Sequence, residues 1–293
     1  MIYFTAWLYW DPPRTAFTIP FISWPVAWYG ILFVTGFILS YFIINPIMTR
    51  FLIQTKAVPG DYADVKEISY RVTDKLCRFV VLGTLVGARL GSVIFYDWEI
   101  YRQNPWEILQ VWKGGLASHG GVIGVTFGIY LFSLYIRKQI PKLTFLRILD
   151  FVAIPAALAS CFIRLGNFVN QEIVGTLTTV PWAVVFGHAA DGSAPLPRHP
   201  VQLYEAAAYL ITFFILFTLW KKKGDILPAG TFVGLLMVLI FGSRFILELW
   251  KDRMTSTWVI PGLEMGQILS IPLILIGGYF AGRGLLKSHS PHS

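Results

Sequence analysis

Long apolar runs recur along the chain and are separated by short polar or charged connections. A helix of about 20 apolar residues is long enough to cross about 30 Å of hydrocarbon. Seven runs come near or reach this length, and they cover residues 25–44, 79–96, 119–136, 148–163, 203–220, 229–250 and 262–282. The pattern predicts an all-α integral membrane protein, a seven-helix bundle that forms a single polytopic domain over residues 1–293.

The connections between these runs differ in character. Residues 1–23 are aromatic and Pro-rich, which indicates a segment lying on the membrane, and residues 45–78 are charged, which indicates a loop or a short amphipathic helix. The fourth run is short and interrupted by Pro155. Residues 164–200 are expected to form a small head outside the membrane, in which residues 176–186 form a strand or two.

One run carries glycines at a spacing of four residues, Gly83, Gly87 and Gly91. This spacing lets two membrane helices approach closely. Arg89 lies in the same run, where a charge is costly unless it faces a cavity or a partner.

Composition supports the membrane prediction, because 55% of residues are hydrophobic and only 14% are charged, against about 25% charged in soluble domains. The net charge of +8 could suggest a nucleic-acid partner. Most basic residues, however, lie in short loops, and no basic helix with interleaved aromatic residues is present. We therefore expect no nucleic-acid partner. The two cysteines share no metal-ligand spacing, so we expect no metal and no cofactor.

The basic residues also predict an orientation. Fifteen of the 24 Lys and Arg residues lie in residues 45–78, 137–147, 221–223 and the C-terminal tail. Cytoplasmic loops carry the excess of positive charge. We expect the N-terminus outside, the C-terminus in the cytoplasm, and the head on the outer side.

A polar stretch over residues 164–175 follows the fourth run directly. If it begins as a helix, Arg164, Asn167 and Gln171 share one face. A helix end with an arginine reaching toward the interface is the plain alternative. The density of hydrogen-bonding groups favours a functional site.

Three further positions could carry chemistry. His119 precedes two glycines at the start of a run and could act as a base near neutral pH, or it is an interfacial histidine. Arg244 and Glu248 lie four residues apart, so they either pair with each other or bind an anion. Clustered arginines in a membrane protein indicate a lipid phosphate. Tyr29 and Tyr204 could instead be interfacial belt residues.

Six motifs together resemble one family, that of the bacterial prolipoprotein diacylglyceryl transferases. They are Trp28-Tyr29-Gly30, Gly87-Ala88-Arg89-Leu90-Gly91, His119-Gly120-Gly121, the stretch from Arg164 to Gly175, the run from His199 to Glu205, and Arg244-Phe245 with Glu248. The resemblance extends from residue 24 to about residue 282.

The resemblance implies transfer of the sn-1,2-diacylglyceryl group from phosphatidylglycerol to the lipobox cysteine of a prolipoprotein signal peptide, in the bacterial inner membrane. The product is a thioether, and glycerol 1-phosphate leaves. We expect His119, Arg164 and Arg244 to be catalytic. The substrate-binding residues expected are Tyr29, Arg89, Asn167, Asn170, Glu172, Gly175, Gln202, Tyr204 and Glu248.

Two positions depart from the family pattern. Ile240 stands where a tyrosine is usual, and Lys251 stands where an arginine is usual; Lys251 keeps the charge but loses the guanidinium fork. On this basis we expect Lys251→Ala to lose little turnover. A lipid flippase or an anion transporter is the alternative function, opposed by the lack of an inverted repeat and by polar residues crowded toward one face. A purely structural scaffold would leave the polar cluster without purpose.

Overall fold

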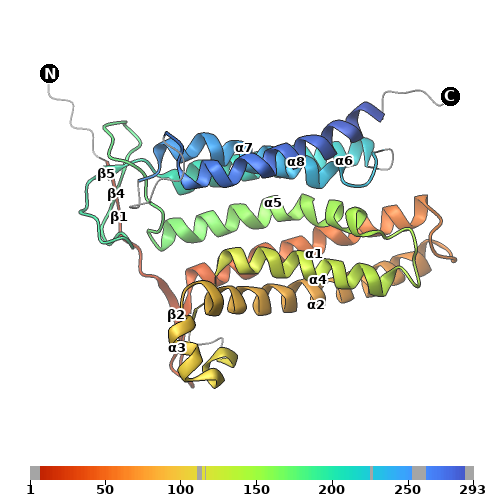
Figure 1. Ribbon diagram of the computed structural model, residues 1–293, viewed down its shortest axis with the longest axis horizontal. Helices are drawn as coiled ribbons and strands as arrows, with labels where there is room; N and C mark the ends of the chain where they lie inside the picture. The colour runs from red at the N-terminus through yellow and green to blue at the C-terminus, as the bar shows by residue number, and fades with distance from the viewer. Residues whose placement is uncertain (1–6, 111–113, 116, 225–226, 253–261, 288–293) are drawn as a thin grey trace. The chain divides into compact units, whose positions relative to one another are not determined.

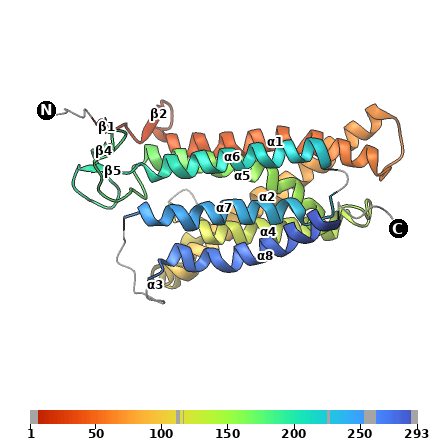
Figure 2. The ribbon, with the colours of Figure 1, turned by 90° about the horizontal axis from the view of Figure 1, so that it is seen from above.

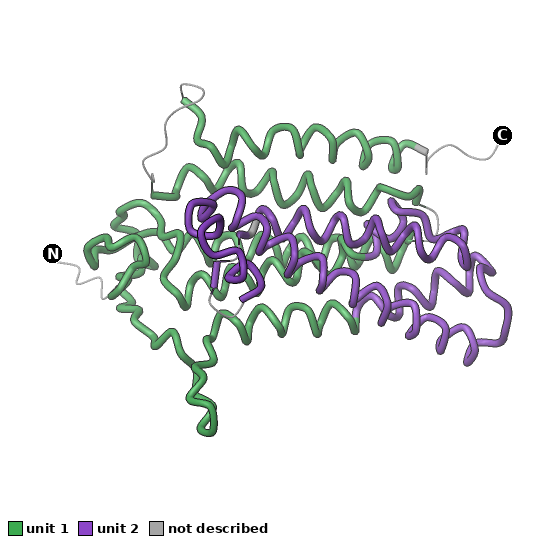
Figure 3. Tube along the Cα trace, turned by 60° about the horizontal axis from the view of Figure 1, so that its bottom comes forward, with its two compact units in different colours: residues 1–42, 152–293 green, residues 43–151 purple. Residues whose placement is uncertain are grey.

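The computed structural model describes residues 7–110, 114–115, 117–224, 227–252 and 262–287. They form two compact units, shown in green and purple in Figure 3. The first unit comprises residues 1–42 and 152–293, and the second comprises residues 43–151. Both ranges of the first unit include residues outside the described part. In the second unit, the connection after residue 110 also includes such residues.

Seven helices in the described part are long and apolar enough to cross a membrane, as the hydrophobic pattern predicted. They are α1 (Trp28–Gln54), α2 (Tyr62–Phe95), α4 (Ser118–Ile136), α5 (Phe145–Val169), α6 (Val201–Lys223), α7 (Thr231–Leu247) and α8 (Met265–Lys287). Shorter elements are α3 (Trp98–Gln103) and the 3₁₀ turns η1 (Pro105–Leu109) and η3 (Glu248–Trp250). The prediction of seven helices that could span a membrane is therefore confirmed.

Two boundary predictions are wrong. Residues 45–78 are mostly helical, because α1 continues to Gln54 and α2 already begins at Tyr62. Asp61 caps α2, and its side chain and that of Asp64 form a reciprocal capping box. Polar turns can extend a helix beyond the hydrocarbon, so charge there marks the membrane boundary and not the helix end.

The fourth helix is neither short nor broken. Helix α5 has 25 residues and continues through Pro155 to Val169. It therefore includes the first six residues of the stretch predicted as head, residues 164–169. The head begins only after this helix ends.

In the second unit, α2 and α4 pack along glycines, as the four-residue spacing predicted. A Cβ added to Gly87 would lie 2.6 Å from the Cα of Gly124, and one added to Gly91 would lie 2.7 Å from the Cα of Gly120. Real Cβ atoms do not approach that closely, so the two backbones are in direct contact. The partner glycines on α4, Gly120, Gly124 and Gly128, again follow at intervals of four residues.

In the first unit, α7 and α8 run side by side, and α6 packs on α7 (Figures 1 and 2). Close approach again requires small residues, since a Cβ on Gly277 would lie 2.7 Å from the carbonyl oxygen of Gly234. This packing places the end of α7, with Arg244 and the following η3 turn, beside the first turn of α8.

The head contains a three-stranded sheet of order β1-β4-β5 (Figure 1). Strand β1 (Leu8–Trp10) runs parallel to β4 (Val184–Phe186), and β5 (Pro197–Arg198) is antiparallel to β4. A separate hairpin joins β2 (Thr15–Ile19) to β3 (Trp24–Ala27). The strand expected within residues 176–186 is present as β4. Strands β1 and β2 lie within residues 1–23, where a segment on the membrane surface was expected, and β3 overlaps the start of the predicted first run, residues 25–44.

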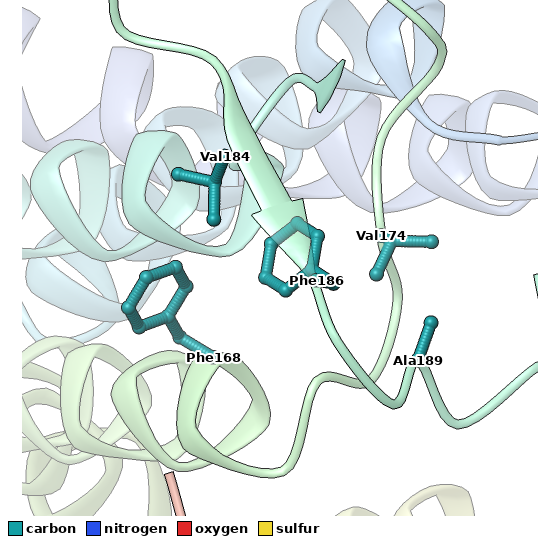
Figure 4. Packing of buried hydrophobic residues seen from close by; sticks show 5 residues of the cluster. All are labelled: Phe168, Val174, Val184, Phe186 and Ala189. Atoms are coloured by element: carbon teal, nitrogen blue, oxygen red, sulfur yellow. The ribbon is translucent and has the colours of Figure 1, made fainter. Parts of the chain in front are cut away.

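A small apolar core joins the head to the end of α5 (Figure 4). Phe168, the strand residues Val184 and Phe186, Val174 and Ala189 are all buried there. Trp10 of β1 stacks on Phe168 with ring centroids 4.7 Å apart, and its indole N–H donates to the Phe168 carbonyl at 3.0 Å. This core fixes the last turn of α5, from which the polar stretch emerges.

Candidate active site

The last turns of α5 begin a chain of polar contacts. Arg164 donates from Nη1 to Oδ1 of Asn167 at 2.9 Å, the neighbour expected at helical spacing. Asn167 donates from Nδ2 to one oxygen of Glu172 at 2.6 Å, and Asn170 donates to the other at 3.0 Å. Two amides thus fix the carboxylate of Glu172 in the loop that follows the helix.

This loop has an unusual backbone. Gln171 and Ile173 both have φ near +57°, a left-handed conformation that is costly for a β-branched residue. Gln202 holds the loop between them, because its Nε2 donates to the carbonyl of Glu172 at 2.6 Å. Gln171 leaves the face that it was predicted to share with Arg164, since its amide donates to Asp11 at 2.9 Å.

A buried ion-pair cluster lies beside Arg164. The side chain of Glu205 on α6 is completely buried, and one of its oxygens lies 2.8 Å from Nε of Arg164. Nζ of Lys251 lies 3.0 Å from its other oxygen and 2.8 Å from an oxygen of Glu248. Buried charges are tolerated when they are paired in this way. The cluster therefore links α5, α6 and η3 through charges.

Tyr29 is packed against the site from the start of α1. A Cβ on Gly166 would lie 2.7 Å from the Tyr29 ring, so the ring rests directly on α5, two residues after Arg164. The Tyr209 ring also lies near Arg164, with its centroid 6.0 Å from the guanidinium carbon. The two rings favour a role for Tyr29 within the site over that of a belt residue.

Arg244 differs from the other cations of the site. Its expected helical neighbour, Glu248, pairs with Lys251. Within the residues that the structure describes, the half-buried guanidinium of Arg244 has no hydrogen bond or ion pair of its own. It does act electrostatically on Tyr209, which places it near the cluster. Lys251 thus pairs with Glu248, the carboxylate that could otherwise have neutralised Arg244.

Gly175 and Tyr204, two other predicted residues, lie on the head side. A Cβ on Gly175 would clash with the main-chain carbonyl oxygen of His199, so glycine is required for close backbone approach there. The Tyr204 hydroxyl accepts from the indole of Trp182 at 2.7 Å and lies 3.1 Å from Nδ1 of His199. Both contacts connect the start of α6 to the head.

Arg89 and His119 belong to the second unit. The Arg89 guanidinium donates to the main-chain carbonyls of Ile108 at 2.8 Å, Gly114 at 2.6 Å and Gly115 at 3.1 Å, and also to that of Glu107. It therefore organises the connection that leads into α4. His119 lies in the first turn of α4 with its side chain exposed.

The titratable groups of the head include Asp11, which lies 2.8 Å from Nδ1 of His188. Hydrogen bonds from His188 and then from Gln171 lower the pKa of Asp11 below its ordinary value. Burial lowers the pKa of His199. No group of three or more metal-binding side chains occurs among the described residues, and His289 and His292 lie outside them.

A model of one family, "Prolipoprotein diacylglyceryl transferase", matches residues 14–282. The chain belongs to the prolipoprotein diacylglyceryl transferase family. It is similar to phosphatidylglycerol–prolipoprotein diacylglyceryl transferases from Protochlamydia amoebophila (47% identity, 93% of each chain covered) and Chlamydia pneumoniae (38%, 93% of each). The protein of that name from Tolumonas auensis is 41% identical over 86% of this chain and 88% of its own. The chain is thus a multi-pass membrane enzyme of this family, as the motifs indicated.

Of the two positions that depart from the diacylglyceryl transferase pattern, Lys251 belongs to the ion-pair cluster and Ile240 packs against an apolar cluster. Ile240 packs against Cys161, Ala206 and Tyr209, so an apolar side chain faces the site where a tyrosine is usual. Lys251 bridges Glu205 and Glu248. A compact ammonium is thus able to contact both carboxylates although it lacks the fork of an arginine.

Sequence reasoning missed three residues of the site. Glu205 ends one of the family motifs and lies four residues after the apolar Val201, so the two share one face of a helix. This spacing could have indicated a buried carboxylate. Lys251 was treated as a mere departure, although it lies three residues after Glu248. Gly266 was not noticed, and a Cβ there would come 2.6 Å from a carboxylate oxygen of Glu248.

Proposed function

We propose that this protein transfers the sn-1,2-diacylglyceryl group of phosphatidylglycerol to the lipobox cysteine of prolipoproteins, the first step of bacterial lipoprotein maturation. Membership of the family and the close relatives support this activity. The observation that carries it at the level of residues is Arg244, a half-buried cation without a carboxylate partner among the described residues, beside a cluster in which the other charges are paired.

The reaction requires three things of the protein. The thiol must lose its proton, since the thiolate is the nucleophile and a cysteine has a pKa of about 8.5. A new sulfur–carbon bond then forms at the glyceryl carbon while that carbon's bond to the phosphate oxygen breaks. The leaving group, glycerol 1-phosphate, takes the electron pair and gains negative charge, which cations must stabilise.

Arg244 is our candidate for stabilising that charge. Five N–H donors in one plane suit a phosphate, and no described carboxylate competes for them. Arg164 contributes positive charge from the neighbouring helix, although Glu205 and Asn167 already engage part of its guanidinium. We assign Arg164 the placing of the headgroup and Arg244 the leaving phosphate.

The remaining residues of the first unit would bind or orient substrate. Tyr29 and the amides of Asn167 and Asn170 offer donors suited to glycerol hydroxyls. Glu172 and Gln202 hold these amides and the loop in place. Glu248 would act through its bridge to Lys251, and Gly175 and Tyr204 would shape the head beside α6.

His119 is our candidate base for the thiol proton, because a neutral imidazole can accept a proton near pH 7. Arg89 would position it indirectly. Its guanidinium holds the carbonyls of Gly114 and Gly115, which lie five and four residues before His119. No cofactor or metal is part of this proposal.

We also propose an orientation from the distribution of basic residues. The N-terminus and the head that follows α5 face the outside, and the C-terminus faces the cytoplasm. The seven helices and the head would serve as one polytopic domain in the bacterial inner membrane. A prolipoprotein signal peptide would present its cysteine from the outer side.

The test is a direct search for product. The purified protein is incubated with phosphatidylglycerol vesicles and a synthetic lipobox peptide, and the peptide mass is measured. We expect a diacylglyceryl adduct on the peptide, and none on a control peptide with serine in place of the cysteine. Phosphatidylcholine, whose choline carries a positive charge, should give little adduct.

Movement of phosphatidylglycerol between leaflets without adduct would instead favour the flippase alternative. Equal turnover of phosphatidylglycerol and phosphatidylcholine would contradict the assignment of a guanidinium to the headgroup phosphate.

A further inference from the structure

A cavity of about 340 Å³ lies in the second unit, between the end of α1 and the start of α2. Its size is at the lower end of ligand pockets, about 300–1,000 Å³. The residues that line it are Asn45, Pro46, Thr49, Arg50, Ile53, Gln54, Tyr62, Lys66 and Tyr70. None of the residues proposed for the transfer reaction is among them.

Two of the residues that line this cavity, Asn45 and Thr49, belong to a buried polar group that also includes Ser69. Thr49 donates to the Ser69 hydroxyl at 2.8 Å, and Ser69 donates to Oδ1 of Asn45 at 3.0 Å. Asn45 is only 4% exposed, and its Nδ2 has no hydrogen-bond partner in the described part of the chain. A buried amide that lacks a partner is costly unless a ligand or water supplies an acceptor.

Both charged side chains that line the cavity are basic. They are Arg50 and Lys66, and no carboxylate of the described residues lines it. The acidic residues that neighbour Lys66 in sequence are engaged elsewhere: Asp61 and Asp64 cap α2, and Glu67 pairs with Arg71 at 2.5 Å. Two cations and a spare amide donor suit an anion with several acceptor oxygens.

The position of the cavity along its helices suits a phosphate at the membrane surface. Residues 28–49 of α1 carry no charge, and Arg50 is the first charged residue of that helix. On α2 the charged residues end at Arg78, and the apolar part runs from residue 79 to its C-terminal end except for Arg89. Arg50 therefore stands at the boundary of the hydrocarbon and Lys66 lies beyond it.

We infer that this cavity binds a phosphate group, held by Arg50, Lys66 and the amide of Asn45. A phospholipid headgroup and a small soluble phosphate share this chemistry. The orientation proposed above would place the site on the cytoplasmic side, but the inference stands on the cavity itself and does not depend on the transferase reaction.

The test measures phosphate binding by titration calorimetry on delipidated protein in detergent. All samples carry Arg244→Gln, which weakens phosphate binding at the proposed reaction site, and any binding that Arg164 retains there is common to the cavity and control variants. The probes are dioctanoyl phosphatidic acid, inorganic phosphate and, as a neutral-headgroup control, dioctanoyl phosphatidylcholine. The cavity variant is Arg50→Gln with Lys66→Gln, and the matched control is Arg137→Gln with Lys138→Gln, two exposed residues of the same unit.

We expect phosphatidic acid, inorganic phosphate or both to bind, and the cavity variant to weaken that binding by at least about tenfold for each lost cation, while the control variant changes it little. Binding of phosphatidic acid alone identifies a lipid headgroup, and comparable binding of inorganic phosphate identifies a soluble ligand.

Asn45→Leu gives an independent reading, because it removes the amide donor without changing charge. A folded Asn45→Leu protein should bind the phosphate more weakly as well. Asn45 is buried, so if this substitution prevents folding, the Arg50→Gln, Lys66→Gln variant and its control decide the test. Absence of binding by both phosphates, or equal losses in the cavity and control variants, would overturn the inference.

Discussion

Lys251→Ala should disable the site, because the structure places this residue at its centre. Its side chain is only 11% exposed, and its ammonium contacts Glu205 at 3.0 Å and Glu248 at 2.8 Å. Removing the ammonium leaves Glu205 with Arg164 alone and Glu248 without its cation. The earlier expectation from sequence, that this change loses little turnover, is therefore replaced.

The magnitude follows from burial. Removing one partner of a fully buried ion pair costs about 3–5 kcal/mol, and exposed pairs are worth about 0–1 kcal/mol. Glu205 is completely buried and Glu248 is 15% exposed, so this site lies near the buried end. The two carboxylates recover part of this cost by rearranging. We therefore expect a net loss of about 2–4 kcal/mol of stability.

Catalysis should also fall for a reason that is separate from the loss of stability. Glu248 follows Arg244 by four residues, so a freed Glu248 carboxylate can pair with Arg244. That pairing would withdraw Arg244 from the lipid phosphate. We expect kcat/KM to fall at least about tenfold, which corresponds to about 1.4 kcal/mol.

The assay measures kcat/KM for a lipobox peptide at several phosphatidylglycerol concentrations, on protein shown to be monodisperse. Lys251→Arg is the matched control, since it keeps the charge and restores the side chain usual at this position in the family. It should retain most activity. A Lys251→Ala protein with unchanged melting temperature and kcat/KM would refute the bridging role.

Three further predictions concern the fold. In a background without native cysteines, Ala194→Cys should react with a membrane-impermeant thiol reagent in intact cells and Lys138→Cys should not; the reverse labelling would contradict the proposed orientation. Gly124→Ala should lower the melting temperature, because overpacking costs about 1–3 kcal/mol, whereas Gly278→Ala, with open space around it, should not; equal effects would disprove direct backbone contact. Because the pKa of Asp11 is lowered, its ionised carboxylate stabilises the head at pH values above 3.8, the ordinary pKa of an aspartate. This stabilisation is lost as the pH falls through the lowered pKa. Acidification to about pH 3 should therefore lower the melting temperature more in the native protein than in Asp11→Asn, and identical pH profiles would exclude this contribution.

The sequence predicted the helices well because each is an apolar run of nearly constant length. It predicted the glycine contact for the same kind of reason, since Gly83, Gly87 and Gly91 lie on one face of any helix that contains them. Helix ends were less predictable. The charged residues 45–78 do not stop α1 and α2, because a helix can leave the hydrocarbon without ending.

The site was predictable only where its contacts are local in sequence. Arg164 and Asn167 are three residues apart, and helical geometry alone brings them together. The contacts of Lys251 with Glu205 and of Gln171 with Asp11 join segments far apart along the chain. No periodicity links such pairs, so the bridging role of Lys251 and the path of Gln171 required the structure.

The central claim is that Arg244, with no carboxylate partner among the described residues, stabilises the leaving phosphate. The most direct test is turnover of Arg244→Lys at saturating phosphatidylglycerol, beside Arg137→Lys as an exposed control. Lysine keeps the charge but not the five donors in a plane, and losing a transition-state donor typically costs about a hundred- to a thousandfold in rate. We predict a folded, monodisperse Arg244→Lys protein with a loss of that size and a control with normal turnover. Near-normal turnover in Arg244→Lys would contradict the claim.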